Sequence, residues 1–168
     1  MKYYIILAIL LFASIFQISF LSFFTFYQAS LDLILVIILL IAVLDNFKKY
    51  WLLIIISGLF LDCFSALPFG AISLSLLASV YLIERLKKDF FGYINFGLVL
   101  ILIAIGALSY NILLMILSKI LEFDFQINWL YNLIYLMPQE IIYNIILAGF
   151  IYYALKKIPA KKQFVPKH

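Results

Sequence analysis

Long apolar stretches separated by short polar groups dominate the pattern of this chain. They cover residues 3–27, 29–44, 50–83, 90–118 and 129–155. Apolar stretches of about 18 residues or more are typical of transmembrane helices. The stretch 50–83 is broken in its middle by residues 62–70, which include polar side chains, a proline and a glycine. The pattern therefore predicts an all-α integral membrane protein, a compact bundle of about six transmembrane helices, some of them short or re-entrant.

Two of these segments allow alternative structures. Residues 50–83 fit either two short spans joined by an outer turn or a re-entrant hairpin, because both return the chain to the same side. Farther along, Pro138 interrupts the last stretch, and proline suits the first turn of a helix but disrupts a helix interior. Residues 129–137 are therefore either an interfacial helix before a span that starts at Pro138, or part of one kinked helix.

The segment 29–44 is short for a membrane span. Its sixteen residues, with Asp32 in the expected first turn, extend about 24 Å as an α-helix. The hydrocarbon core of a bilayer is about 30 Å thick. We therefore expect this segment to lean on neighbouring helices or to thin the bilayer locally.

The basic residues set the expected orientation. Eleven of the twelve Lys and Arg residues form four clusters: Lys2; Lys48 and Lys49; Arg85, Lys87 and Lys88; and Lys156, Lys157, Lys161, Lys162 and Lys167. With an even number of spans these clusters share one side, and basic loops of this kind stay in the cytoplasm. We expect residues 1–157 to form a single transmembrane domain, residues 158–168 to form a basic tail, and both ends to be cytoplasmic. Residues 3–27 are interpreted as a retained helix and not as a cleaved signal.

Composition narrows the possible functions. The chain is 68% hydrophobic and 12% charged, whereas soluble domains are roughly half apolar and a quarter charged. One cysteine and one histidine leave no internal disulfide and no His/Cys metal cluster. Because catalytic triads, zinc-protease motifs and P-loops are also missing, we expect no enzyme activity, no metal and no cofactor. The formal charge of +4 is attributed to insertion and anionic headgroups, not to a nucleic-acid partner.

Asp62 is the most informative polar residue. A carboxylate near the bilayer centre costs about 2.5 to 3.5 kcal/mol on insertion scales. Gly58, Asp62 and Ser65 are spaced four and three residues apart, so they lie along one face of a helix. Asp62 could contact another helix or a partner protein, or it could be a helix-end carboxylate at the outer interface. Asp32 has the same ambiguity.

A run of small residues follows the predicted turn at Pro68 and Gly70. Ala71, Ser75 and Ser79 recur every four residues, and such faces let membrane helices approach closely. We favour packing within the bundle over an interface with another protein.

Another polar group is expected on the last two spans. Glu140 and Asn144 lie four residues apart, and Asn111 and Ser109 on the preceding span could join them in an interior hydrogen-bond network. If the last span starts at Pro138, Glu140 is interfacial and only Asn144 lies deep. A structural role is favoured over a transport role.

The segment 58–70, GLFLDCFSALPFG, resembles the rod shape-determining MreD family. The hallmark of that family is a glycine, an aspartate four residues later, a small-residue stretch and a Pro-x-Gly turn. The segment 30–35 is similar to the Pro-Asp-Leu opening of the family's second helix, with Leu31 where proline is usual, and Pro138 with Asn144 resembles its last helix. The candidate structural or partner-contact residues are thus Asp32, Gly58, Asp62, Pro68, Gly70, Ser75, Pro138, Glu140 and Asn144.

The resemblance implies a non-enzymatic subunit of the bacterial elongation complex in the cytoplasmic membrane. Such proteins bind MreC, a single-span protein, and help couple the MreB filament to the enzymes of side-wall peptidoglycan synthesis. The family is also similar in fold to the substrate-binding subunits of energy-coupling-factor vitamin transporters, which gives the alternative function of solute capture. Against that alternative, Ala8 and Ala13 are five residues apart and do not form a small-residue docking face.

Overall fold

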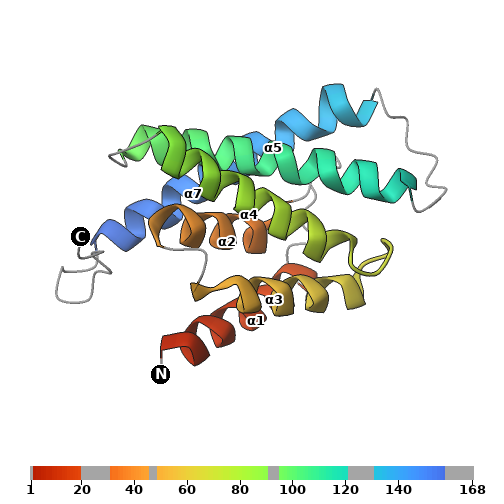
Figure 1. The fold of residues 1–168 in the computed structure, drawn as a ribbon, viewed down its shortest axis with the longest axis horizontal. Coiled ribbons are helices and arrows are strands. Elements are labelled where there is room, and N and C mark those ends of the chain that lie inside the picture. The colour runs from red at the N-terminus through yellow and green to blue at the C-terminus, as the bar shows by residue number, and fades with distance from the viewer. Residues whose placement is uncertain (1, 20–30, 46–48, 91–94, 121–130, 158–168) are drawn as a thin grey trace.

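The computed structural model describes residues 2–19, 31–45, 49–90, 95–120 and 131–157. All regular elements in these residues are helices (Figure 1). They are α1 (Lys2–Ser19), α2 (Leu33–Leu44), α3 (Trp51–Phe64), α4 (Ala71–Phe90), α5 (Phe96–Ile120), the π-helical η3 (Asn132–Leu136) and α7 (Met137–Lys157). The predicted all-α fold with about six helices is confirmed for this part of the chain.

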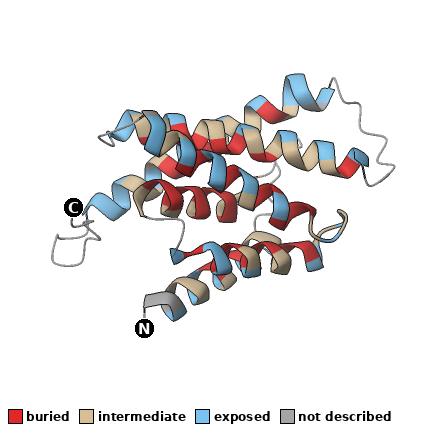
Figure 2. Cartoon of the chain, in the orientation of Figure 1, coloured by how far each residue is buried: buried red, intermediate tan, exposed pale blue. Residues whose placement is uncertain are grey.

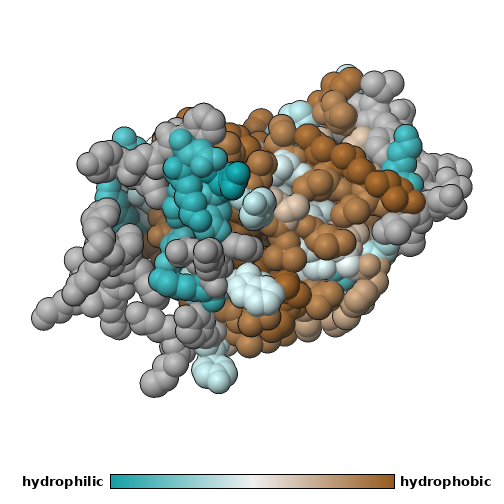
Figure 3. Space-filling view, in the orientation of Figure 1, coloured by the Kyte–Doolittle hydropathy of each residue, from teal (hydrophilic) through white to brown (hydrophobic). Residues whose placement is uncertain are grey.

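Successive α-helices run in opposite directions, so their ends gather at two ends of the bundle (Figure 1). One end contains the start of α1, α3 and α5 and the finish of α2, α4 and α7. We call it the basic end, because it carries the described basic side chains of residues 49, 85, 87, 88, 156 and 157. Figure 3 shows hydrophilic surface gathered there, next to a broad hydrophobic surface.

The short helix α2 lies at the centre of the bundle. Its sequence, LILVIILLIAVL, has no polar residue, and it packs against α1, α4, α5 and α7. A helix that is apolar all round belongs in a protein core or in a membrane, and eight of its twelve residues are buried within the bundle (Figure 2). The helix is shorter than expected, because Asp32 occupies the N-cap position instead of the first turn.

Helices α3 and α4 are two separate antiparallel helices joined by residues 65–70. The sequence predicted a helix end near Ile83, but α4 continues to Phe90. Two ion pairs between residues four apart support the extra turns, Arg85 with Asp89 and Lys88 with Glu84. Such pairs stabilise helices on exposed surfaces.

Helix α5 crosses α2 and α4 at a glycine. A Cβ atom on Gly106 would lie 2.8 Å from the end of the Leu39 side chain and 3.3 Å from the Ile83 side chain, so a larger residue would require the Leu39 side chain to shift. The helix begins at Phe96 and not at the expected residue 90, which is the last residue of α4.

The last helix is one continuous helical run with a π-helical stretch. Residues 132–136 are π-helical and lead directly into α7. Pro138 lacks an N–H group and its ring clashes with the preceding turn of an α-helix, and a wider turn relieves that clash. Of the two alternatives, the kinked single helix is closer to the structure; Trp129 lies outside the described residues.

Large apolar side chains are exposed along several helices. On α7, Ile142, Ile146 and Phe150 are 54%, 65% and 73% exposed. Two helices, Phe96–Ile120 and Leu133–Lys157, are long and apolar enough to cross a membrane, and α2 and α3 are apolar but shorter.

Candidate functional site

Asp62 caps the start of the neighbouring helix α4. Its carboxylate accepts hydrogen bonds from the backbone N–H groups of Ile72 (2.9 Å) and Ser73 (3.2 Å) and from the Ser73 hydroxyl (2.8 Å). The first N–H groups of a helix have no partner in their own helix. Gly70 precedes α4 and has no side chain that could cap it, so Asp62 supplies the missing acceptor from α3.

The other residues of segment 58–70 shape the same hairpin. The carbonyl of Pro68 accepts the N–H of Ala71 at 3.0 Å, and Gly70 adopts a left-handed φ of 92° that side chains disfavour. One turn before Asp62, α3 touches the α4 backbone, because a Cβ on Gly58 would lie 2.7 Å from the Ser73 Cα atom. Gly58, Asp62, Pro68 and Gly70 therefore act together to join α3 to α4.

These contacts decide between the two interpretations of Asp62. The side chain is 3% exposed, so it is a buried contact with another helix and not a carboxylate at an open helix end. Ala71, Ser75 and Ser79 are 1%, 0% and 0% exposed, which agrees with the preferred interpretation of that face as packing within the bundle.

Asp32 and Asn144 belong to a second polar cluster, which joins α1, α2 and α7. The Gln17 amide nitrogen donates to the Asp32 carboxylate at 2.7 Å. The side-chain oxygen of Gln17 accepts the Ile34 N–H at 3.0 Å. The Asn144 side chain, 1% exposed, accepts the Asp32 N–H at 3.2 Å. Sequence analysis missed Gln17, although an amide side chain inside an uncharged apolar stretch is itself a signal for a contact between helices.

Glu140 forms a separate contact with α5. The Asn111 amide donates to its carboxylate at 3.1 Å, whereas Ser109 donates to the Gly106 carbonyl of its own helix at 2.8 Å. The expected four-residue network is therefore wrong in two respects: Ser109 does not take part, and Asn144 faces α2 instead of Glu140.

Three acidic residues of the interior lie away from the basic end. Tyr110, 6% exposed on α5, lies close enough to Asp32, Asp62 and Glu140 to interact with all three electrostatically. These carboxylates come from α3, α7 and the start of α2. These three carboxylates thus lie away from the basic end, where Asp45, Glu84 and Asp89 pair with basic side chains.

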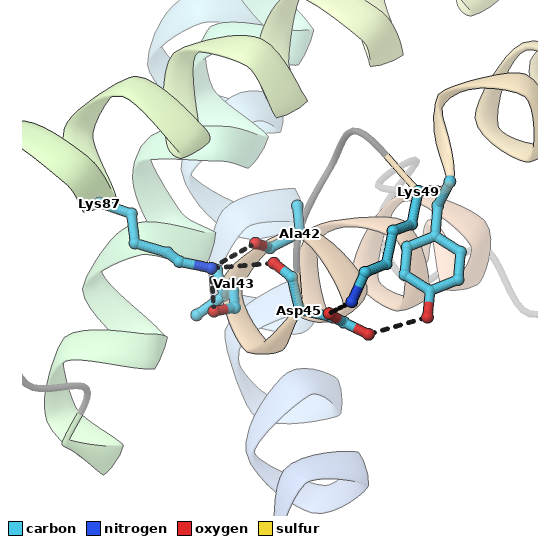
Figure 4. Close-up of polar contacts among 6 residues, drawn as sticks. Ala42, Val43, Asp45, Lys49 and Lys87 are labelled. Carbon is cyan, nitrogen blue, oxygen red and sulfur yellow. Dashed lines mark hydrogen bonds and ion pairs between the residues drawn. The ribbon is translucent and has the colours of Figure 1, made fainter. Parts of the chain in front are cut away.

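Lys87 forms the main polar contact at the basic end (Figure 4). Its ammonium group donates to the backbone carbonyls of Ala42, Val43 and Asp45 at 3.2, 3.0 and 2.9 Å. The last carbonyls of a helix have no partner in their own helix, so Lys87 caps α2. Lys87 lies beyond the apolar part of α4. Partial burial lowers the pKa of its ammonium group, although the nearby carboxylates of Glu84 and Asp45 act to raise it.

Asp45 continues this contact toward α3. Its carboxylate forms an ion pair with Lys49 at 3.3 Å and accepts the Tyr50 hydroxyl at 2.8 Å (Figure 4). The end of α2 is therefore fixed to α4 by Lys87 and to the start of α3 by Asp45.

The polar contacts described above do not resemble a metal site. Within the described residues, no three His, Cys, Asp or Glu side chains come together in a way that would hold a metal ion. The side chains of Asp62, Asn144 and Lys87 instead act between helices, where each binds backbone groups of a neighbouring helix. Comparisons with protein-family models, with characterised proteins and with solved structures find no match to the chain.

Proposed function

We propose that this protein is a non-enzymatic, multi-pass subunit of a bacterial cell-elongation complex, similar in role to the MreD family. In this role it binds an MreC-like single-span protein and helps organise side-wall peptidoglycan synthesis. The observation that carries the proposal is the segment 58–70. Its glycine, aspartate and Pro-x-Gly turn resemble the family motif, and they act together in one buried helix hairpin.

The proposal places all six α-helices in the bacterial cytoplasmic membrane. It is supported by the exposed apolar side chains, by the two helices long enough to cross a bilayer and by the location of most described basic residues, Lys119 excepted, at one end of the bundle. Basic residues favour the cytoplasmic side, so the basic end faces the cytoplasm. The proposal takes α3 and α4 as two spans and not as a re-entrant hairpin, and their antiparallel course along the bundle supports this choice (Figure 1).

A scaffold role fits the use of the interior polar groups. Asp62, Asp32 and Asn144 bind backbone or side-chain groups of neighbouring helices. Such contacts fix helix positions, which suits a protein that presents a defined surface to partners.

The rival function, solute capture in a vitamin transporter, is less well supported. The described part of α1 exposes the large side chains Ile9 (52%) and Phe12 (72%) beside the small Ala8, whereas the small Ala13 is buried. A surface of large side chains does not allow the close helix approach that small-residue faces provide.

Depletion of the protein in its host tests the proposal. Loss of an elongation subunit is expected to turn rod-shaped cells round, and affinity purification from detergent extracts is expected to recover an MreC-like single-span protein. An unrelated multi-pass protein purified in parallel serves as the control. Unchanged rods without such a partner would contradict the proposal, and tight vitamin binding by the purified protein would favour solute capture.

A further inference from the structure

Most of the described cationic side chains at the basic end are engaged in contacts within the protein. Lys87 is bound to the carbonyls at the end of α2 (Figure 4). Three others form ion pairs: Lys49 with Asp45, Arg85 with Asp89, and Lys88 with Glu84. Lys156 and Lys157 differ, because both are exposed at the end of α7 and neither pairs with a carboxylate in the described part of the chain.

Lys157 ends an exposed apolar stripe on α7. Ile142, Ile146, Phe150 and Tyr153 are 54%, 65%, 73% and 68% exposed, and Lys157 follows Tyr153 by four residues. Spacings of three and four residues place all five side chains on one helix face. The buried residues of this helix, among them Asn144 and Ala148, face the bundle. The exposed face is therefore apolar over three turns and cationic at its end.

The part of the stripe from Ile146 to Lys157 matches one leaflet of a bilayer in length. Ile146 and Lys157 are eleven residues apart, which corresponds to about 16 Å along a helix. Half of the hydrocarbon core is about 15 Å thick. An acyl chain can therefore lie along Ile146 and Phe150 while its headgroup reaches the two lysines.

Aromatic rings border the cationic end. Phe96 at the start of α5 contacts Tyr152 of α7, with ring centroids 5.3 Å apart. Tyr153 is exposed on the same turn as Tyr152. Aromatic side chains favour the level of lipid headgroups, so these rings mark the depth at which a headgroup would meet Lys156 and Lys157.

We propose that the end of α7 is a binding site for an acidic phospholipid, with the acyl chain along the apolar stripe and the phosphate at Lys156 and Lys157. A neutral lipid would match the stripe and leave the lysines without a counter-charge. An acidic water-soluble ligand would match the lysines and leave the stripe uncovered. The inference rests on the proposed membrane location but not on the proposed partner or cellular role.

Lipid titration of the purified full-length protein tests the site. Native mass spectrometry in a mild detergent can count bound phosphatidylglycerol and bound phosphatidylcholine on each variant. Each lysine near an anionic headgroup contributes on the order of fivefold in affinity. The double variant Lys156→Gln/Lys157→Gln is therefore expected to bind phosphatidylglycerol about tenfold or more weakly, with phosphatidylcholine binding unchanged.

The matched control is the double variant Lys49→Gln/Arg85→Gln, which removes the same charge from the same end at residues already paired with carboxylates. Its phosphatidylglycerol affinity is expected to fall less than about threefold. Equal losses in the two variants, or no preference for phosphatidylglycerol in the unaltered protein, would overturn the site. Resistance to alkaline carbonate extraction tests the membrane location separately, so a protein that stays in the membrane without this lipid preference overturns the lipid site alone.

Discussion

Asp62 illustrates how a single buried side chain defines a helix boundary in this protein. It binds N–H groups ten and eleven residues later in the chain. The spacing of residues 58–70 indicated that Asp62 should be buried or interfacial. Spacing does not show which backbone N–H groups bind its carboxylate. That choice depends on the turn at Gly70 and on the close approach of α3 and α4.

Substitution of Asp62 by asparagine should destabilise the bundle. The amide keeps one oxygen and turns an NH2 group toward the donors of α4, so at least one buried donor loses its acceptor, at a cost of about 1 to 3 kcal/mol. The thermal unfolding midpoint of the purified protein in detergent is expected to fall by about 2 to 4 °C per kcal/mol. Asp89→Asn, at an exposed ion pair, should shift it by less than about 2 °C. Equal shifts would show that Asp62 does not act as a cap.

Gln17, Asp32 and Asn144 mark the limit of sequence analysis for single residues. Asp32 and Asn144 were candidates because polar groups in apolar stretches need partners. Their pairing across 112 positions could not be derived, because local periodicity says nothing about which faces of distant helices meet. Pairing residues by their shared helix face therefore joined Asn144 to Glu140 incorrectly.

At the level of elements, the α3–α4 hairpin depends on close backbone packing. Gly58→Ala places a Cβ atom 2.7 Å from the Ser73 Cα atom, and overpacking of this kind costs about 1 to 3 kcal/mol. The thermal unfolding midpoint of the Gly58→Ala variant should therefore lie below that of the unaltered protein. The matched control is Gly97→Ala in α5, where nothing lies within 4 Å of the new atom and alanine is the better helix former. If the two variants were equally stable, α3 and α4 could not approach as closely as this contact requires.

The end of α2 should depend on Lys87. Lys87→Met removes the donor to three carbonyls, so the last turn of α2 is expected to fray. The Asp45 amide is bonded to the Ile41 carbonyl in this turn. If the variant lowers the free energy of opening the turn by about 1.4 kcal/mol, hydrogen exchange at this amide, measured by mass spectrometry, should become about tenfold faster. Lys156→Met, at an exposed residue, should leave that amide unchanged. Protection that survives in Lys87→Met would exclude a capping role.

Element boundaries were predicted less well than element number. Hydropathy located the described α-helices, but it could not show that ion pairs extend α4 to Phe90 or that Asp32 stands outside α2. Both differences arise from side-chain contacts that hydropathy does not measure. The π-helical stretch before Pro138 likewise reflects how one helix relieves a clash, and the sequence supported two answers equally.

At the scale of the whole molecule, the distribution of basic residues along the chain was the most useful guide to where the helix ends lie. With an even number of helices, it placed the start of the first helix and the finish of the last at the same end of the bundle, and Figure 1 shows this arrangement for α1 and α7. Charge clusters carry this information because every traverse of the bundle reverses the chain direction. Which helix lies at the centre could not be derived, since several segments are almost equally apolar.

Cys63 offers a direct test of the proposed orientation. It is exposed one residue before the end of α3, away from the basic end. In intact cells a membrane-impermeant maleimide is therefore expected to label it from outside, after permeabilisation of the outer membrane where one exists. Lys157→Cys in a Cys63→Ser background should react only after the cytoplasmic membrane is opened. The reverse pattern would invert the proposed topology.

The enclosure of α2 has a consequence for how the protein is made. This helix leaves the ribosome before α4, α5 and α7, which are among the helices that surround it, and the side chain that binds the Asp32 N–H emerges 112 residues later. A nascent chain halted before residue 144 therefore holds an unfinished core. Quality-control proteases that survey the membrane should recognise such truncated chains, so that early stop codons yield no stable fragment.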